Sequence, residues 1–499
     1  MNFRKDHIMK TSKLLVVFAA ALMLAVIVMS CELYQPPVEP AVVQPAFNPG
    51  SADFTRYVAI GNSLTAGFQS NALSARDQVY SFPKFLATAF RTASFVQPLF
   101  IDPGVGNRQN LVSFSLTTGP VIANEPNVFP GNPAPYVSAP PAGAYDNLGI
   151  PGAVLGDIIN TTDFAGQLTG PRRNPFFLLV LRSSAIGRNI LAQARSRNPT
   201  FMTCWIGSND VLGYATGGGA NPTLLTSAAT FNTLYKQLMD SLRSITPNVV
   251  VANIPDVTTI PFFSTVANSI GPRLPAGIQF RYQRGTNRGV SFDSTRFATP
   301  YGAPYICLTG GTYAPLLGAA GGQGGGKFYR DNSASFPTLP AGIDTTKPFG
   351  LHPQNPWPTA LVLDDAEAAT ATSRIADFNR SIDSLARNRG IPVVDMNAVL
   401  KDIAGKGRYV PGYGTFSTAY ITGGAFSYDG VHPSSRGAVL MANEFIKVIN
   451  AKYGATIPLV DYGTAPQLQG LGKEAVGKVT GGDFGSFDFY VDLLRNIPH

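Results

Sequence analysis

Short apolar segments that end in Gly-, Asn- or Asp-containing turns recur along this chain, and amphipathic segments separate them. The strand-like segments lie at residues 57–60, directly after 146, and at 201–206, 249–253 and 391–395. Apolar residues with helical spacing lie at about 185–195, 231–242, 364–387 and 435–450. Such alternation predicts an α/β fold, in which helices cover both faces of a parallel sheet.

Polar clusters follow these strands or precede these helices. Ser63, Gly152, Asn209 and the segment from Asp429 to His432 all occupy such positions. Ligand sites in this architecture lie beyond the carboxyl ends of the strands. The sequence therefore predicts that these four clusters meet at one edge of the sheet and form a functional site.

Ser63 lies where the first strand gives way to a helix, within Gly61-Asn62-Ser63. Backbone N–H groups at a helix start are unpaired and attract developing negative charge. A serine there suits a nucleophile beside an oxyanion donor. It equally suits a helix N-cap, because Ser is a favoured residue at that position. This stretch alone leaves both interpretations open.

A serine nucleophile needs a base, and one of the four histidines fits that role best. His7 lies in the N-terminal segment, His499 is the last residue and His352 lies in a Gly- and Pro-rich region. His432 precedes a core helix, and Asp429 three residues earlier can orient its imidazole. A lone D-x-x-H pair is typical of a surface turn, but the position at the strand edge favours a catalytic pair.

Oxyanion donors are expected from the neighbouring turns. Gly152 presents its backbone N–H without a side chain, Asn209 carries an amide, and Ser63 adds its own N–H. As alternatives, Gly152 is an ordinary turn glycine and Asn209 an N-cap. The G-x-S-x-G elbow of α/β-hydrolases is absent from the chain, which argues against that fold.

The polar clusters resemble the conserved blocks of the SGNH/GDSL hydrolase family, and they occur in the same order. The matching segments are Gly61-Asn-Ser-Leu64, Gly152, Gly207-Ser-Asn-Asp210 and Asp429-Gly-Val-His432. The resemblance implies a three-layer α/β/α sandwich with a flavodoxin-like parallel sheet. It also implies the site residues: the nucleophile Ser63, the base His432, its partner Asp429, and an oxyanion hole formed by Ser63, Gly152 and Asn209.

One position departs from the family pattern, and one block has an alternative residue. Asn62 stands where the family usually has Asp, and we expect this to alter local hydrogen bonding rather than to abolish activity. Gly149 lies three residues before Gly152 and is an alternative for the second block. Gly152 is preferred because Ala153 to Asp157 continues as a helix start.

The N-terminal residues predict export. Basic residues precede an apolar run from Leu14 to Met29, which ends at Ser30-Cys31. The segment resembles a bacterial lipoprotein signal, although Val28 and Met29 depart from that motif. The resemblance implies lipidation of Cys31 and an anchor in the bacterial cell envelope, on the periplasmic or cell-surface side. An uncleaved membrane anchor is the alternative, and Met9 is an alternative start.

The chain is expected to have the following organisation: a signal peptide over 1–30, a Pro-rich tether over 31–50, a hydrolase domain over 51–454 and an unassigned tail over 455–499. Two Gly- and Pro-rich stretches interrupt the domain. We call residues 92–144 the first insertion and residues 262–358 the second insertion. We expect both to be long loops, and the first to be mostly irregular. The sequence leaves open whether Cys204 and Cys307 form a disulfide.

Composition narrows the function further. The formal charge of +8 falls to +5 without residues 1–30, and no basic cluster with interleaved aromatic residues is present, so nucleic-acid binding is not supported. No Cys or His cluster has metal-ligand spacing, and no cofactor is expected. The sequence predicts a membrane-anchored serine esterase or lipase, with the insertions walling an apolar acyl pocket. A carbohydrate deacetylase of the same family and a non-catalytic binding lipoprotein are the alternatives.

Overall fold

A computed structural model describes most of the chain between residues 44 and 467. The parts of this range that it does not describe are residues 116–118, 126–134, 169–172, 183, 188, 272–273, 275–276 and 294–303. The predicted signal peptide, Cys31, most of the predicted tether and residues 468–499 lie outside the described residues. The chain divides into two compact units, residues 1–45 and 46–499, and the second carries the sheet and the site.

A five-stranded parallel sheet forms the centre of this unit. Its strands in spatial order are β13 (Val393–Val394), β8 (Val249–Ala252), β7 (Phe201–Trp205), β1 (Tyr57–Gly61) and β6 (Asn147–Gly149). The second strand in the chain lies on one side of the first, and the third lies on the other. This is the 2-1-3-4-5 order of flavodoxin-like sheets, so the predicted fold class is confirmed.

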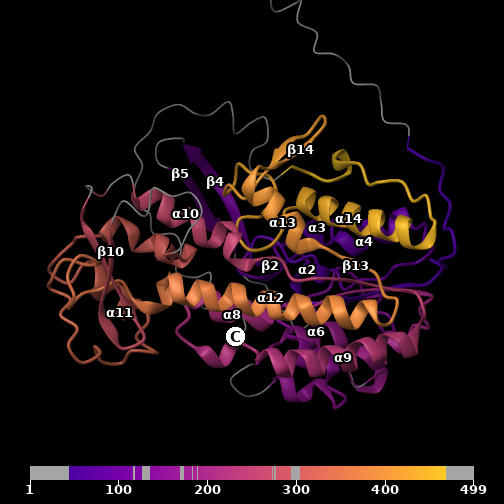
Figure 1. Ribbon diagram of the computed structural model, residues 1–499, viewed down its shortest axis with the longest axis horizontal. Helices are drawn as coiled ribbons and strands as arrows, with labels where there is room; N and C mark the ends of the chain where they lie inside the picture. The colour runs from indigo at the N-terminus through magenta and orange to yellow at the C-terminus, as the bar shows by residue number, and fades with distance from the viewer. Residues whose placement is uncertain are drawn as a thin grey trace, which may run out of the picture. The chain divides into compact units, whose positions relative to one another are not determined.

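The alternation of side chains along the strands produces two apolar layers. Val58 and Ile60 of β1 pack with α9 (Ala228–Ile245) and α12 (Asp365–Arg387). Tyr57 and Ala59 point to the opposite face and pack with α4 (Phe82–Ala89), α13 (Met396–Gly405) and α14 (Ser435–Tyr453). Figure 1 shows the two sets of helices on either side of the sheet. The sheet is buried on both faces, which is why its strands are mostly apolar.

The long amphipathic helices were predictable, and several shorter ones were not. The periodic segments at 231–242, 364–387 and 435–450 correspond to α9, α12 and α14, and the segment at 185–195 corresponds to the shorter α7 (Ile190–Ser196). The sequence analysis did not identify α4, α6 (Phe176–Leu181) or α13.

Among the residues described, the first insertion is mostly irregular, as expected, but both insertions also contain regular elements that the sequence analysis did not identify. The first insertion contains β3 (Val105–Gly106) and the hairpin of β4 (Gln109–Ser115) with β5 (Gly119–Asn124). The second contains most of α10 (Pro261–Ile270), the hairpin of β9 (Gln279–Arg284) with β10 (Asn287–Asp293), and α11 (Gly324–Asp331). Aromatic side chains stabilise the second insertion: fully buried Trp357 stacks on Phe349, and Phe280 lies 5.4 Å away between ring centroids.

The ends of the described chain also pack on the domain. The Asn443 side chain in α14 accepts a hydrogen bond from the Val460 N–H and donates one to the Val460 carbonyl. Asn48 and Thr456 exchange backbone hydrogen bonds of 3.3 and 2.9 Å. Ordered contacts therefore reach from residue 46 to residue 465, beyond both ends of the predicted domain.

Candidate active site

Ser63 is the first residue of α2 (Ser63–Ala66), a single helical turn directly after β1. Asn62 is the N-cap of this turn, and its side-chain oxygen accepts a hydrogen bond of 3.0 Å from the Leu64 N–H. Asn62 therefore supplies the cap, whereas Ser63 is left free for another role. The Ser63 side chain is nearly buried and lies at the carboxyl edge of the sheet.

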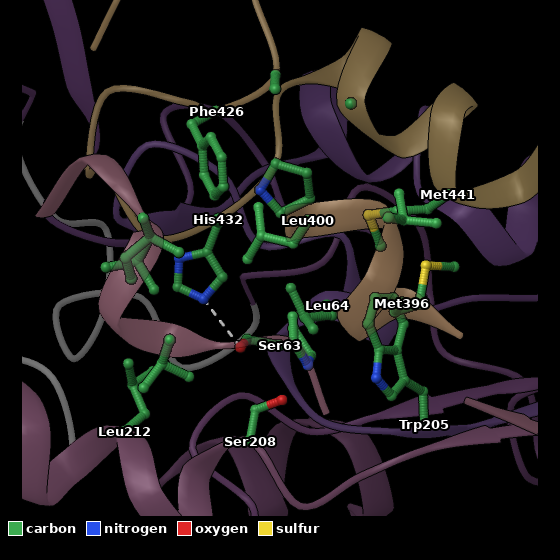
Figure 2. Close-up of a pocket in the computed structure, with 18 of the residues that line it drawn as sticks. Ser63, Leu64, Trp205, Ser208, Leu212, Met396, Leu400, Phe426, His432 and Met441 are labelled. Atoms are coloured by element: carbon green, nitrogen blue, oxygen red, sulfur yellow. Dashed lines mark hydrogen bonds between the residues drawn. The ribbon is translucent and has the colours of Figure 1, made fainter. Parts of the chain in front are cut away.

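The structure brings Ser63, His432 and Asp429 together. His432 Nε2 lies 2.9 Å from Ser63 Oγ (Figure 2), and His432 Nδ1 lies 2.9 Å from Asp429 Oδ2. The three side chains thus form a continuous hydrogen-bonded chain, although Ser63 is 369 residues away from His432 in the sequence. His352, the other histidine that the structure describes, has no part in it.

The Asp429 carboxylate is buried and accepts several hydrogen bonds. Its Oδ1 accepts from the backbone N–H groups of Val431 (2.9 Å) and His432 (2.8 Å), and its Oδ2 accepts from the Asn71 N–H (2.9 Å). Burial alone would raise the pKa of Asp429, but the charge of His432 and these hydrogen bonds outweigh burial and lower the pKa. Asp429 is therefore ionised at neutral pH and can orient the imidazole.

Phe68 fixes the other side of the imidazole. Its ring centroid lies 4.7 Å from that of His432, with the planes tilted by 51°. Phe68 comes directly after Gly67, the C-cap of α2, so the segment that carries the serine also supplies the packing surface for the base. The sequence analysis missed Phe68, and its only signal was an apolar residue soon after the first block.

The structure separates the roles of Gly149 and Gly152. Gly149 lies within β6, where its N–H bonds to Asn147 Oδ1 (3.0 Å) and where any side chain would clash with the backbone of α2. Gly152 lies in the following turn at a φ of +78°. Among the described residues, no acceptor bonds to the N–H groups of Gly152 or Ser63. Gly149 is thus a packing residue, and the arrangement favours Gly152 as a donor.

Asn209 begins α8 (Asn209–Thr216), and its side chain reaches the Gly152 turn. Its Nδ2 donates a hydrogen bond of 2.9 Å to the Ala153 carbonyl, which leaves the second amide hydrogen for another acceptor. Buried Asp210 strengthens the link, since its Oδ2 accepts from the Leu155 N–H at 2.9 Å. The turns after β6 and β7 are therefore tied together beside Ser63.

An apolar pocket opens beside Ser63 and His432. Figure 2 shows Leu64, Trp205, Met396, Leu400, Phe426 and Met441 around it. Helix α13 supplies much of the wall, together with α14, the start of α8 and the segment Pro255–Ile260. No described residue of either insertion lines this pocket. For the residues described, the expectation that the insertions form its walls was therefore wrong.

Other features of the sequence were placed as follows. Cys204 and Cys307 are buried and free, so they do not form a disulfide. Within the described ranges, no group of His, Cys, Asp and Glu side chains could hold a metal ion. None of the helices described has the length and hydrophobicity that crossing a bilayer requires.

No protein-family model matches the chain. No curated protein sequence matches it either. Solved structures with a similar arrangement include Axe2, an acetylxylan esterase from Geobacillus stearothermophilus. Its sequence is 11% identical to this chain, and the alignment covers 80% of this chain and 96% of Axe2 with a TM-score of 0.31. A lipase/acylhydrolase from Enterococcus faecalis has 12% identity, with 80% and 96% covered and a TM-score of 0.29. A phospholipase A1 from Streptomyces albidoflavus NA297 has 13% identity, with 79% and 98% covered and a TM-score of 0.27.

Proposed function

We propose that this protein is a serine hydrolase of carboxylic esters, of the SGNH/GDSL type, that works through an acyl-enzyme. The observation that carries this proposal is the continuous chain from Ser63 Oγ through His432 to Asp429, with both contacts at 2.9 Å. Three of the four sequence blocks that resemble the family lie at the ends of β1, β6 and β7, and the fourth directly precedes α14. The sheet itself has the strand order that this family would have. A binding protein would have no need for this combination.

The geometry supports a two-step reaction. Ser63 Oγ attacks the ester carbonyl while His432 Nε2 takes the hydroxyl proton, and ionised Asp429 stabilises the imidazolium that forms. His432 then returns the proton to the leaving alcohol. In the second step His432 activates a water, which attacks the acyl-enzyme and releases the acid.

Three N–H donors are available for the oxyanion. They are the backbone N–H groups of Ser63 and Gly152 and the amide of Asn209, whose position is fixed by Ala153. Fixed donors of this kind stabilise the tetrahedral intermediate because they need no reorganisation during the reaction. We expect Asn209→Ala to lower kcat by about 10²–10³-fold.

The pocket favours an ester with an apolar acyl group of several carbons. Its wall is formed mainly by Leu, Val, Ile, Met, Phe and Trp side chains and meets both Ser63 and His432. Burial of each methylene contributes about 0.8 kcal/mol, so such a wall discriminates among acyl chain lengths. A sugar ring would find few hydrogen-bond partners there, which disfavours the deacetylase alternative for this pocket.

Hydrolysis of p-nitrophenyl acetate, butyrate and octanoate by the full chain tests this proposal. The expected result is the highest kcat/KM on butyrate or octanoate, and loss of activity in Ser63→Ala. The control is Ser384→Ala, which removes an exposed hydroxyl on α12 and should leave activity unchanged. Equal activity of wild type and Ser63→Ala would refute the proposal, and activity on acetyl esters alone would favour the deacetylase.

We also propose that Cys31 is lipidated and anchors the protein in the bacterial cell envelope. This part rests on the sequence of residues 1–31 alone. Growth with labelled palmitate should label the wild-type protein and not Cys31→Ala. Equal labelling of both would contradict it.

A further inference from the structure

We propose that Asn71 is a positioning residue for the Asp429 carboxylate, and that the first insertion holds Asn71 in place. This inference rests on the proposed function, because it gives the first insertion a role in the same reaction. Asn71 lies four residues beyond Gly67, outside every segment that resembles the family blocks.

The backbone at Asn71 has an unusual conformation. Ser70 and Asn71 are consecutive non-glycine residues with φ values of 49° and 63°, and both are buried. Left-handed backbone is costly for residues with a side chain, although Asn tolerates it best. Such a conformation persists only where surrounding contacts impose it.

The consequence is that two neighbouring N–H groups point at the loop that carries Asp429. The Asn71 N–H donates to Asp429 Oδ2 at 2.9 Å, and this is the oxygen that His432 Nδ1 also contacts. The Ser70 N–H donates to Ser427 Oγ at 3.0 Å, and Ser427 Oγ in turn lies 3.2 Å from Asp429 Oδ1. Both carboxylate oxygens are thus fixed from the Ser70–Asn71 turn.

The first insertion holds this turn from the other side. Asn71 Nδ2 donates to the Asn107 carbonyl at 3.3 Å, and the Gln109 N–H donates to the Ser70 carbonyl at 2.8 Å. A side chain at Gly106, whose φ is 129°, would clash with the Asn71 carbonyl oxygen. The buried ion pair of Arg108 with Asp77 attaches the same segment to α3 (Ala75–Gln78).

The test is a set of matched variants assayed on the best p-nitrophenyl ester. Val at position 71 disfavours left-handed backbone because it is β-branched, whereas Gly accepts it and still supplies the N–H. We expect Asn71→Val to lower kcat by about 10–100-fold, the range of one hydrogen bond to a charged group, with KM unchanged. Asn71→Gly should keep kcat within about threefold, since it lacks the same side chain but keeps the donor.

A second pair of variants changes the first insertion instead of the Ser70–Asn71 turn. Gly106→Ala should displace Asn71 and lower kcat as Asn71→Val does. The control is Gly143→Ala in the same insertion, where the nearest atom is Arg197 Nη1 at 3.8 Å, and it should behave as wild type. If Asn71→Val fails to fold by circular dichroism, Asn71→Ala and Gly106→Ala provide the same comparison.

Three outcomes would overturn the inference: wild-type kcat in both Asn71→Val and Gly106→Ala, equal losses in Asn71→Val and Asn71→Gly, or a rise in KM in place of the fall in kcat. Ser63→Ala, assayed alongside, separates this failure from failure of the proposed function. If Ser63→Ala is inactive and the other variants keep their kcat, the inference alone fails. If Ser63→Ala is fully active, both fail.

Discussion

The two insertions have similar composition, and both contact the loop that carries Asp429 and His432, but their contacts differ in kind. The first insertion packs Ile122 in an apolar cluster with Tyr428, but it also acts through polar groups: it holds the Ser70–Asn71 turn, which donates a hydrogen bond to Asp429. The second acts on the backbone and by apolar packing: the Phe262 N–H donates to the Gly430 carbonyl at 3.0 Å, and Leu308 lies against Gly430. No described residue of either insertion lines the apolar pocket.

This difference separates two ways in which a distant segment can support a site. A hydrogen bond to a buried carboxylate fixes a charged group that takes part in the reaction. Packing around Trp357 and Phe280 instead extends the hydrophobic core up to the same loop. We therefore expect changes in the first insertion to appear mainly in kcat, and changes in the second mainly in stability.

The largest effect is expected from the carboxylate itself. Asp429→Asn keeps the shape of the side chain but removes the charge that stabilises the imidazolium, so kcat should fall by about 10⁴-fold. The loss sets the upper limit for any effect that the first insertion has through Asp429. Steady-state kinetics on the best ester measures it. A loss smaller than that of Asn71→Val would show that Asn71 acts by another route.

Trp357→Ala tests the second insertion. Removing this fully buried ring should lower the free energy of unfolding by about 3–5 kcal/mol, while kcat per folded molecule stays within about threefold. Urea unfolding and active-site titration measure the two quantities. Leu339→Ala is the control, because its side chain is 49% exposed in the same insertion. A selective loss of kcat in Trp357→Ala would break the proposed division between the insertions.

Leu400→Trp tests whether acyl preference is independent of both insertions. The larger side chain on α13 should fill part of the pocket and lower the octanoate-to-acetate ratio of kcat/KM by about 10–100-fold. Leu339→Trp makes the same exchange on the second insertion and should leave the ratio unchanged. If the two variants behave alike, the pocket is not where the acyl chain binds.

The smallest effect concerns the pH dependence of stability, and it has opposite signs at Glu367 of α12 and at Asp429. Burial raises the pKa of Glu367 to about 7, with a contribution from the charge of Asp364, which also pairs with Arg284 of the second insertion. The folded protein therefore holds a proton that the unfolded chain releases near pH 4.5. The stability from this group is complete below about pH 4.5 and is lost as the pH rises through about 7. Asp429, whose pKa is lowered, loses its contribution as the pH falls.

Glu367→Gln removes this dependence. The Gln oxygen can still accept the Asp364 N–H that Glu367 accepts at 2.9 Å, so the helix cap is kept. After allowance for solvent screening of this half-buried group, the variant should gain about 1–2 kcal/mol of stability relative to wild type between pH 5 and pH 8. Thermal unfolding at the two pH values measures the gain. An equal difference at both would contradict the raised pKa.

Much of the fold could be predicted because its signals are local. Val58 and Ile60 alternate with Tyr57 and Ala59 along β1, and α9 carries Phe231, Leu238 and Leu242 at helical spacing. Shorter elements such as α4 and α6 give too few residues for a period to emerge. The hairpins in the insertions were missed because Gly- and Pro-rich segments also form strands when distant side chains cover them.

The site, like the fold, has a part that the sequence could predict and a part that it could not. Ser63, Asp429 and His432 could be chosen because their residue types carry the chemistry and because few histidines compete. Asn71 and Phe68 could not be predicted. Asn71 acts through its backbone N–H, which leaves no signature in the sequence, and a single Phe is too common to indicate a role. The pocket wall was assigned to the wrong segments, because the contact of α13 with the Ser63 turn depends on the whole three-layer packing.

Trapping of the nucleophile tests the central claim most directly. The full chain would be treated with a fluorophosphonate, digested and mapped by mass spectrometry, beside the His432→Ala and Asp429→Asn variants. The account predicts one adduct, on Ser63, which forms quickly in the wild type and much more slowly in both variants. An adduct on another residue, no adduct, or equal labelling of Ser63 in all three proteins would contradict it.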